Sequence, residues 1–172
     1  MGAYPFILAS IALSPWFNIY DNALSDLGNT ATNGSVGYVY DTGLILAGAL
    51  VFVFAVQLLR ASPNLKVAVW TTPLMVASFD LALVGVFSEN TGSIHGVVSE
   101  IFFATIVITM LAFSYLSWPL GSPRIGAVAL TFGILSSLIW FIKWPWPGVA
   151  IQEATTSGMT ALWLLLIAFK SR

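Results

Sequence analysis

Long apolar runs alternate with short polar segments along nearly the whole chain. Each run is close to the roughly 20 residues that a helix needs to cross the hydrocarbon of a bilayer. The pattern therefore predicts one all-α domain over residues 1–172, a polytopic transmembrane helical bundle. The expected transmembrane helices, about six in number, cover residues 2–17, 38–59, 65–87, 93–118, 124–141 and 149–169.

Composition supports a membrane protein and excludes several classes of site. Hydrophobic residues make up 58% of the chain, charged residues 8%, and the mean hydropathy is +0.91, whereas soluble domains carry about 25% charged residues. The absence of cysteine excludes Cys-ligated zinc and iron–sulfur clusters, and a single histidine excludes bis-histidine haem. A metal ion is not expected, and the identity of any other cofactor is left open. The net charge of −1 gives no footprint for nucleic acid.

Charge placement predicts the orientation of the bundle. Five of the six basic residues fall on one side if the chain crosses six times, and the positive-inside rule makes that side cytoplasmic. Both termini are then cytoplasmic, in a multi-pass protein of the cell membrane. Acidic residues gather at the opposite face, with Asp80 deeper and Lys143 as the basic exception. The basic residues of the first side are Arg60, Lys66, Arg124, Lys170 and Arg172, and the acids of the other are Asp21, Asp26, Asp41, Glu89, Glu100 and Glu153.

Residues 88–100 interrupt two apolar runs with several ionisable or polar side chains. Glu89, His95, Ser99 and Glu100 lie within this segment, and ionisable groups beside hydrocarbon are functional candidates. His95 and Ser99 are one helical turn apart and are expected to share a face, while Glu100 points about 100° away from Ser99. His95 is either a general base or proton carrier, one ligand of a metal ion completed by carboxylates, or a histidine that only hydrogen-bonds the turn.

The polar residues elsewhere allow both a structural and a functional interpretation. Ser25 and Asp26 lie in the polar segment 18–36, which predicts a short helical turn at Ala23–Leu27 stopped by Gly28. An aspartate there is often only a turn former, and an acid that opens a helix, such as Glu153, is favourable by itself. Lys143 is a plausible partner for Asp80, Glu153 or Glu89.

The order of these motifs resembles a known membrane family. The segment Ala23-Leu-Ser-Asp-Leu-Gly-Asn29 precedes the second apolar run, His95 opens the fourth, and Ala150-Ile-Gln-Glu153 opens the sixth. Together they resemble the six-helix family DUF998, which is similar to the Frag1/DRAM/Sfk1 group. That wider group is associated with membrane-lipid handling. The resemblance implies Ser25, Asp26, His95 and Glu153 as site positions, but it supplies no reaction.

Three functions fit these features. The first is a pocket near the outer face that binds, and in one version modifies, a lipid headgroup or small amphiphile; the others are a proton- or cation-coupled transporter or channel element, and an accessory subunit of another membrane protein. Membrane lipids are the expected partners, with self-association or a second membrane protein as alternatives, and catalysis is left open. The expected catalytic groups are His95, Asp26, Glu153 and Ser25, and the expected ligand-binding groups are Asp41, Asp80, Glu89, Ser99, Glu100, Lys143, Gln152 and Trp144.

Overall fold

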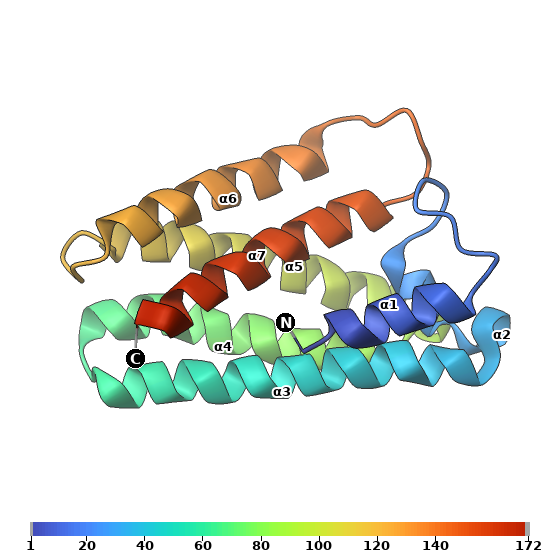
Figure 1. Cartoon of the computed structure of the whole chain (residues 1–172), viewed down its shortest axis with the longest axis horizontal. Helices are drawn as coiled ribbons and strands as arrows, with labels where there is room; N and C mark the ends of the chain where they lie inside the picture. Colours follow the sequence, from blue (N-terminus) through green and yellow to red (C-terminus); the bar gives the residue numbers. More distant parts are fainter. Residues whose placement is uncertain (1, 171–172) are drawn as a thin grey trace.

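The computed structural model describes residues 2–170, and throughout this range the regular structure is helical (Figure 1). Five long helices run back and forth along the bundle, and a shorter one lies beside them. Short helical segments fill the connections at one end. The elements are α1 (Tyr4–Leu13), η1 (Leu24–Gly28), α2 (Thr30–Asn33), η2 (Gly34–Val36), α3 (Gly37–Ala61), α4 (Leu65–Val86), η3 (Glu89–Thr91), α5 (Ser93–Leu116), α6 (Pro123–Phe141) and α7 (Ala150–Lys170).

The long helices match the predicted runs because their ends carry recognisable stop and start signals. Asn64 caps α4, since its side-chain oxygen accepts a hydrogen bond from the Val67 N–H at 3.0 Å. Pro123 opens α6 at a position where the missing N–H costs nothing. The predicted turn at Ala23–Leu27 is confirmed as the single-turn helix η1.

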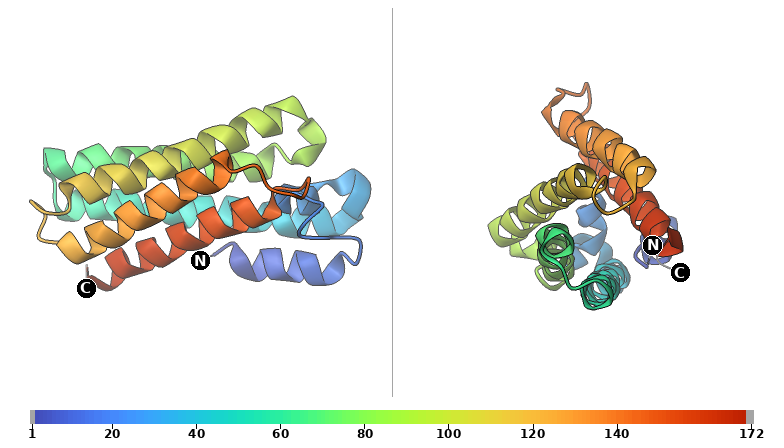
Figure 2. Two further views of the ribbon diagram at one scale, coloured as in Figure 1. Left: turned by 90° about the horizontal axis from the view of Figure 1, so that it is seen from above. Right: turned by 90° about the vertical axis from the view of Figure 1, so that its left-hand side faces the viewer.

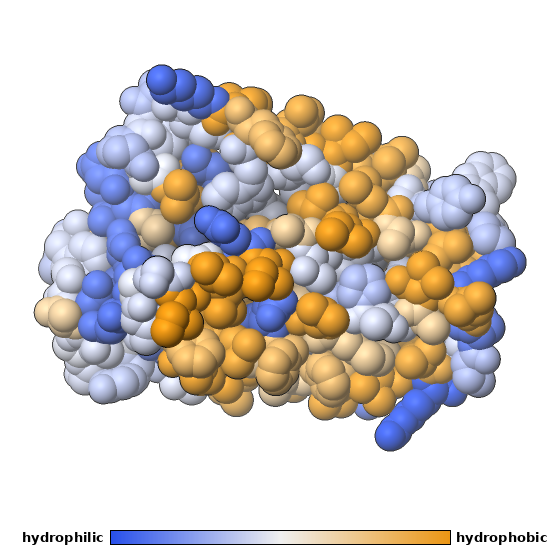
Figure 3. Space-filling view, turned by 180° about the vertical axis from the view of Figure 1, so that it is seen from behind, coloured by the Kyte–Doolittle hydropathy of each residue, from blue (hydrophilic) through white to orange (hydrophobic). Residues whose placement is uncertain are grey.

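Four helical segments are long and apolar enough to cross a membrane: Thr30–Ala61, Leu65–Val86, Ser93–Leu116 and Pro123–Phe141. Helix α7 is of similar length, but it carries more polar residues, among them Gln152, Glu153 and Thr156. On the face that Figure 3 shows, apolar residues predominate along the middle of the molecule, and hydrophilic residues are concentrated at the two ends. A bilayer accounts for such a band, because exposed leucine, valine and phenylalanine side chains are stable against lipid. The four apolar helices indicate a membrane protein.

The first helix is shorter than the predicted segment 2–17. Its ten residues span about 15 Å at 1.5 Å per residue, half of a hydrocarbon core of about 30 Å. The helix ends at Leu13 because Pro15 disfavours helical geometry at Ser14, which adopts φ −119° and ψ 78°. Figures 1 and 2 show α1 beside α7 in one half of the bundle, and α1 begins near the middle of the bundle's length. The predicted segment 2–17 therefore contains a helix, but that helix covers only Tyr4–Leu13.

The two ends of the bundle differ in charge. The turns α3–α4 and α5–α6 and the end of α7 lie together (Figure 1), and we call this the basic end because it holds Arg60, Lys66, Arg124 and Lys170. The opposite end holds η1, η3 and the loop between α6 and α7. We call it the acidic end, because its acids include Asp21, Asp26, Glu89, Glu100 and Glu153.

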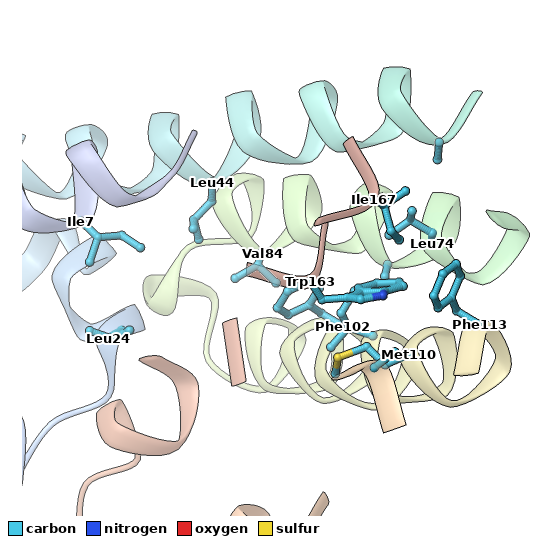
Figure 4. Close-up of a cluster of buried hydrophobic side chains, with 14 of the residues drawn as sticks. Ile7, Leu24, Leu44, Leu74, Val84, Phe102, Met110, Phe113, Trp163 and Ile167 are labelled. Carbon is cyan, nitrogen blue, oxygen red and sulfur yellow. The ribbon is translucent and has the colours of Figure 1, made fainter. Parts of the chain in front are cut away.

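Two contacts organise the interior. Helices α3 and α4 approach closely at Gly48, where an added Cβ would lie 2.5 Å from the Ser78 carbonyl oxygen. Toward the basic end, Trp70, Phe113 and Trp163 form an aromatic plug, with ring centroids 5.0 to 6.2 Å apart in edge-to-face arrangements. Figure 4 shows Trp163 among apolar side chains that include Met110, Phe113 and Ile167. The rest of the core extends from there toward the acidic end, where Ile7 and Leu24 lie.

Candidate functional site

Backbone hydrogen bonds join the loops of the acidic end into a cover over the bundle, which we call the roof. The Gly148 N–H donates to the Tyr20 carbonyl at 2.9 Å, and the Val149 and Ala150 N–H groups donate to the Asn22 carbonyl at 3.1 and 3.0 Å. Gly148 is required for this approach, because a Cβ there would lie 2.5 Å from the Asn22 oxygen. These bonds join the first loop to the start of α7 and cover that end of the bundle.

Beneath the roof, η1 is held against α7 by a buried carboxyl group. Glu153 is 8% exposed, and its Oε2 accepts the Leu24 N–H at 2.5 Å, across 129 positions of sequence. The bond satisfies one of the backbone N–H groups that the first turn of η1 leaves free. The same helical turn buries Ser25 beside Glu153 at the cavity described below.

Asp26 has a structural role within η1. One of its oxygens, Oδ2, accepts hydrogen bonds from the Ala23 N–H and from the Asn22 side chain, both at 3.0 Å. This geometry is the turn-forming alternative for an aspartate at this position. Asp26 is not among the residues that line the cavity.

His95 is buried at the start of α5, and both of its ring nitrogens are engaged. Nδ1 lies 2.7 Å from the Phe87 carbonyl oxygen, which can only accept, so Nδ1 carries a proton. Nε2 lies 3.0 Å from Glu89 Oε2 and 3.2 Å from Ser99 Oγ. His95 therefore joins the end of α4, η3 and α5. The predicted shared face of His95 and Ser99 is confirmed.

The same contacts define what His95 can do chemically. A neutral His95 would accept the Ser99 hydroxyl proton at Nε2, as in a nucleophile–base pair. A protonated His95 would donate to Glu89 instead. Because an ionised Glu89 lies at the closer distance, this geometry favours the ion pair over activation of Ser99. His95 thus holds the end of α4, η3 and α5 together at the acidic end. Within residues 2–170, its pair with Glu89 is the one ion pair formed.

Glu89 lies outside the membrane-spanning helices, and its pKa reflects its contact with His95. The hydrogen bond from His95 lowers the pKa of the Glu89 carboxyl below its ordinary value of 4.5, against an opposing effect of burial. Attraction to the charged imidazole of His95 and a hydrogen bond from Ser25 also lower the pKa of this carboxyl group. A depressed pKa stabilises the fold above the unfolded value, and that contribution is lost as the pH falls through the folded value.

We therefore expect Glu89→Gln to lower the unfolding temperature near neutral pH by several degrees, equivalent to about 1 kcal/mol, because solvent screens a carboxylate that is 29% exposed. The deficit should shrink as the pH falls below 4.5 and Glu89 of the wild-type protein takes up a proton. Thermal unfolding in detergent at a series of pH values measures it. Glu100→Gln, on an exposed side chain of the same end, is the control. A deficit that stays the same into acid would contradict the role of this carboxylate.

An elongated cavity of about 110 Å³ lies between α1, α3, α4, α5 and α7. Its polar end is formed by Ser25, Ser99 and Glu153, whereas most of the remaining wall is apolar. On α3 it extends from Tyr40 to Val51, which corresponds to about 16 Å at 1.5 Å per residue. The cavity thus reaches from the acidic end to about half the depth of the bundle.

The side wall of this cavity contains a contact that sequence reasoning missed. Tyr4 of α1 donates a hydrogen bond to Ser157 of α7 at 3.0 Å, and both residues line the cavity. A tyrosine within an otherwise apolar segment and a serine one turn beyond Glu153 are the only sequence signals for it. Because α1 covers only half of the bundle, this hydrogen bond joins α1 and α7 beside the cavity.

The cavity does not continue to the basic end. Leu74 lines it, but Trp70, one turn away on α4, lines a second cavity of about 200 Å³ instead. Phe113 and Lys170 border that second cavity as well, and the Lys170 ammonium donates to the Gly121 carbonyl and to Ser122. The aromatic plug therefore lies between the two cavities.

Several predicted site residues lie elsewhere. Asp80 is 8% exposed and its Oδ2 has no hydrogen-bond partner among the described residues, yet it does not line the cavity. Glu100 and Lys143 are exposed, and no ion pair joins Lys143 to an acid in the described part of the chain. The predicted pairing of Lys143 with Asp80, Glu153 or Glu89 does not form.

The remaining three predicted ligand-binding residues border the site without lining the cavity. Asp41 is buried where α3 packs closely against Gly28 of η1. Gln152 is buried beside Glu153, and its Oε1 has no partner within residues 2–170. The Trp144 indole N–H donates to the Ile139 carbonyl at 2.9 Å, and its ring stacks on Trp146 at 4.9 Å. In the described range, no three acidic or histidine side chains gather closely enough to hold a metal ion.

Comparison with known proteins identifies the family but no activity. No curated protein and no solved structure matches the chain. The family model described as "Protein of unknown function (DUF998)" matches residues 1–170, which is nearly the whole sequence and includes every element that forms the cavity. The chain therefore belongs to the DUF998 family.

Proposed function

We propose that this protein binds a membrane amphiphile, with its polar end at Glu153 and its apolar part in the interior cavity. The observation that carries the proposal is the polarity of the cavity wall. A buried carboxyl group and two hydroxyl groups form one end, and most of the remaining wall is made of apolar side chains from five helices, with a few hydroxyl groups such as those of Ser78 and Thr160 among them. A molecule with one polar end and one hydrocarbon chain matches that distribution.

The size of the cavity fits part of such a molecule. An apolar cavity of about 150 Å³ holds benzene, so the 110 Å³ present here accommodate a short stretch of chain without rearrangement. A longer chain would extend toward the bilayer past α1, which covers only part of this side. The roof over the acidic end is closed by backbone hydrogen bonds, so we infer that the ligand enters from the membrane, past the contact of Tyr4 with Ser157.

We infer further that the basic end faces the cytoplasm, according to the positive-inside rule, and that the membrane is the cell membrane. The polar end of the cavity then lies at the level of the outer leaflet. In this arrangement α3 to α7 cross the bilayer and α1 enters it from the outer side. The association of the Frag1/DRAM/Sfk1 group with lipid handling is consistent with the proposal, but similarity to that group remains a prediction.

Transport of protons or cations has less support. The aromatic plug lies between the two cavities, and Asp80 lines neither of them. A transport path would need polar groups across this region, whereas it contains Trp70, Phe113 and Trp163. A role as an accessory subunit has no specific feature in its favour.

Native mass spectrometry of gently extracted protein tests the proposal. The expected result is a population of protein that carries one amphiphile and keeps it while surrounding lipids and detergent are removed. A protein that retains only loosely held lipid, removed in parallel with the bulk lipid, would overturn the proposal. The variants that fill the cavity, considered in the Discussion, separate lipid in the cavity from lipid on the outer surface.

A further inference from the structure

Within residues 2–170, the carboxyl group at the polar end of the cavity has no cation in direct contact with it. Glu153 is more than nine-tenths buried, and within residues 2–170 the Leu24 N–H is the one recorded hydrogen-bond donor to its carboxyl group, at Oε2. His95 is paired with Glu89, and Lys143 is exposed. The second oxygen, Oε1, therefore has neither a hydrogen-bond donor nor an ion-paired cation from the described chain.

A buried carboxyl group in this condition favours a positively charged ligand. Burial of an unpaired carboxylate is costly, so the group either keeps a proton or gains a cation. His95 attracts this carboxyl group without contacting it, and Asp26 and Glu89 oppose that attraction with their own negative charge. A ligand that brings its own positive charge would remove the cost, whereas an anionic ligand would increase it.

The number of acceptors at this end also matches one particular headgroup. Glu153 Oε1, Ser25 Oγ and Ser99 Oγ are oxygens of residues that line the polar end. A primary ammonium group has three N–H donors and no acceptor, so it can donate to each of these oxygens. A hydroxyl headgroup offers a single donor and no charge.

We propose that the cavity selects amphiphiles that carry a primary amine at the polar end, held by Glu153 with Ser25 and Ser99. This inference rests on the proposed function, because it concerns the headgroup of the same ligand. It adds a preference that the apolar part of the cavity cannot generate. Glu153 is in this account a binding residue, and no bond is formed or broken.

Equilibrium binding of two ligands with the same chain tests the preference. Radiolabelled dodecylamine and 1-dodecanol are bound separately to the full-length protein in nanodiscs, and binding to empty nanodiscs is subtracted to remove partition into lipid. The wild-type protein is expected to bind the amine at least tenfold more tightly than the alcohol. Glu153→Gln should reduce this preference to less than threefold while binding of the alcohol persists, because the amide oxygen still accepts from Leu24 but the charge is absent.

Glu100→Gln is the matched control, since it removes one carboxylate from the same end but outside the cavity, and it should keep the wild-type preference. If the wild-type protein binds both ligands with equal affinity, the amine inference is overturned and the proposed function stands. If it binds neither ligand above empty nanodiscs, the proposed function itself fails. The preference of the wild-type protein decides the inference even if Glu153→Gln is too unstable to assay.

Discussion

Replacement of Ala77 by leucine is expected to lower the occupancy of the cavity by tenfold or more. Ala77 is fully buried on α4 and lines the cavity wall, so its three additional carbon atoms must enter the space of about 110 Å³ that the ligand chain would use. A tenfold loss of affinity for the ligand corresponds to about 1.4 kcal/mol of binding free energy. Native mass spectrometry of wild-type and variant protein, purified in parallel, measures the fraction that carries the ligand.

The control for this prediction is Ala104→Leu, which makes the same change on the exposed side of α5 and should keep wild-type occupancy. Ala161→Leu fills the same cavity from α7 and should reproduce the loss, which guards against a local defect of α4. If both cavity variants fold and retain as much amphiphile as the control, the bound molecule lies on the outer surface of the bundle and the proposed function is wrong.

Replacement of Gly48 by alanine is expected to destabilise the bundle by about 3 kcal/mol, or a fall of about 6–12 °C in the unfolding temperature for a chain of this size. The added Cβ would lie 2.5 Å from the Ser78 carbonyl oxygen and 2.7 Å from the Ala82 nitrogen. Both atoms belong to the backbone of α4, so no side-chain rotation relieves the contact. Helices α3 and α4 would have to separate, and small residues at such crossings are typical of membrane helix pairs.

Gly96→Ala is the matched control for Gly48. It makes the same substitution within α5, but nothing lies within 4 Å of the added Cβ. The gain in helix propensity, about 1 kcal/mol, should leave this variant as stable as the wild-type protein or more so. Equal unfolding temperatures for the two variants would show that close packing of α3 on α4 does not govern stability.

The length of the apolar runs predicted the long helices, because each run is nearly uninterrupted. The ends were less certain where the stop signal is a single residue. The first apolar run continues to Phe17, but its helix stops at Leu13 because Pro15 restricts the residue before it. In η1, by contrast, the turn signal Ser-Asp-Leu-Gly was sufficient to predict a helical turn, because an aspartate and a glycine favour the same local geometry.

The site was predictable only where local geometry determined it. His95 and Ser99 meet because residues four apart share a helical face, and Glu100 is exposed because it points away from that face. The bond from Leu24 to Glu153 could not be predicted, since it depends on how the first loop folds over α7. The contact of Tyr4 with Ser157 likewise depends on the position of α1 beside α7.

Charge along the sequence indicated where a site would form but not which acids belong to it. The acids do gather at one end of the bundle, as the loops of that end require. Only Glu153 among them lines the cavity, while Asp26 supports its own turn and Glu89 pairs with His95. These roles differ because the side chains point in different directions. The sequence pattern does not determine that direction in loops or at the start of a helix.

Photolabelling of the wild-type protein tests the central claim most directly. An amphiphile with a primary amine headgroup and a photoreactive diazirine within its chain is equilibrated with the protein in nanodiscs, illuminated, and mapped by peptide mass spectrometry. The account predicts saturable labelling of cavity residues such as Val51, Ala77 and Leu164, which excess unlabelled dodecylamine prevents. Labelling confined to lipid-facing residues such as Leu130 and Ile134, and unaffected by the competitor, would contradict it.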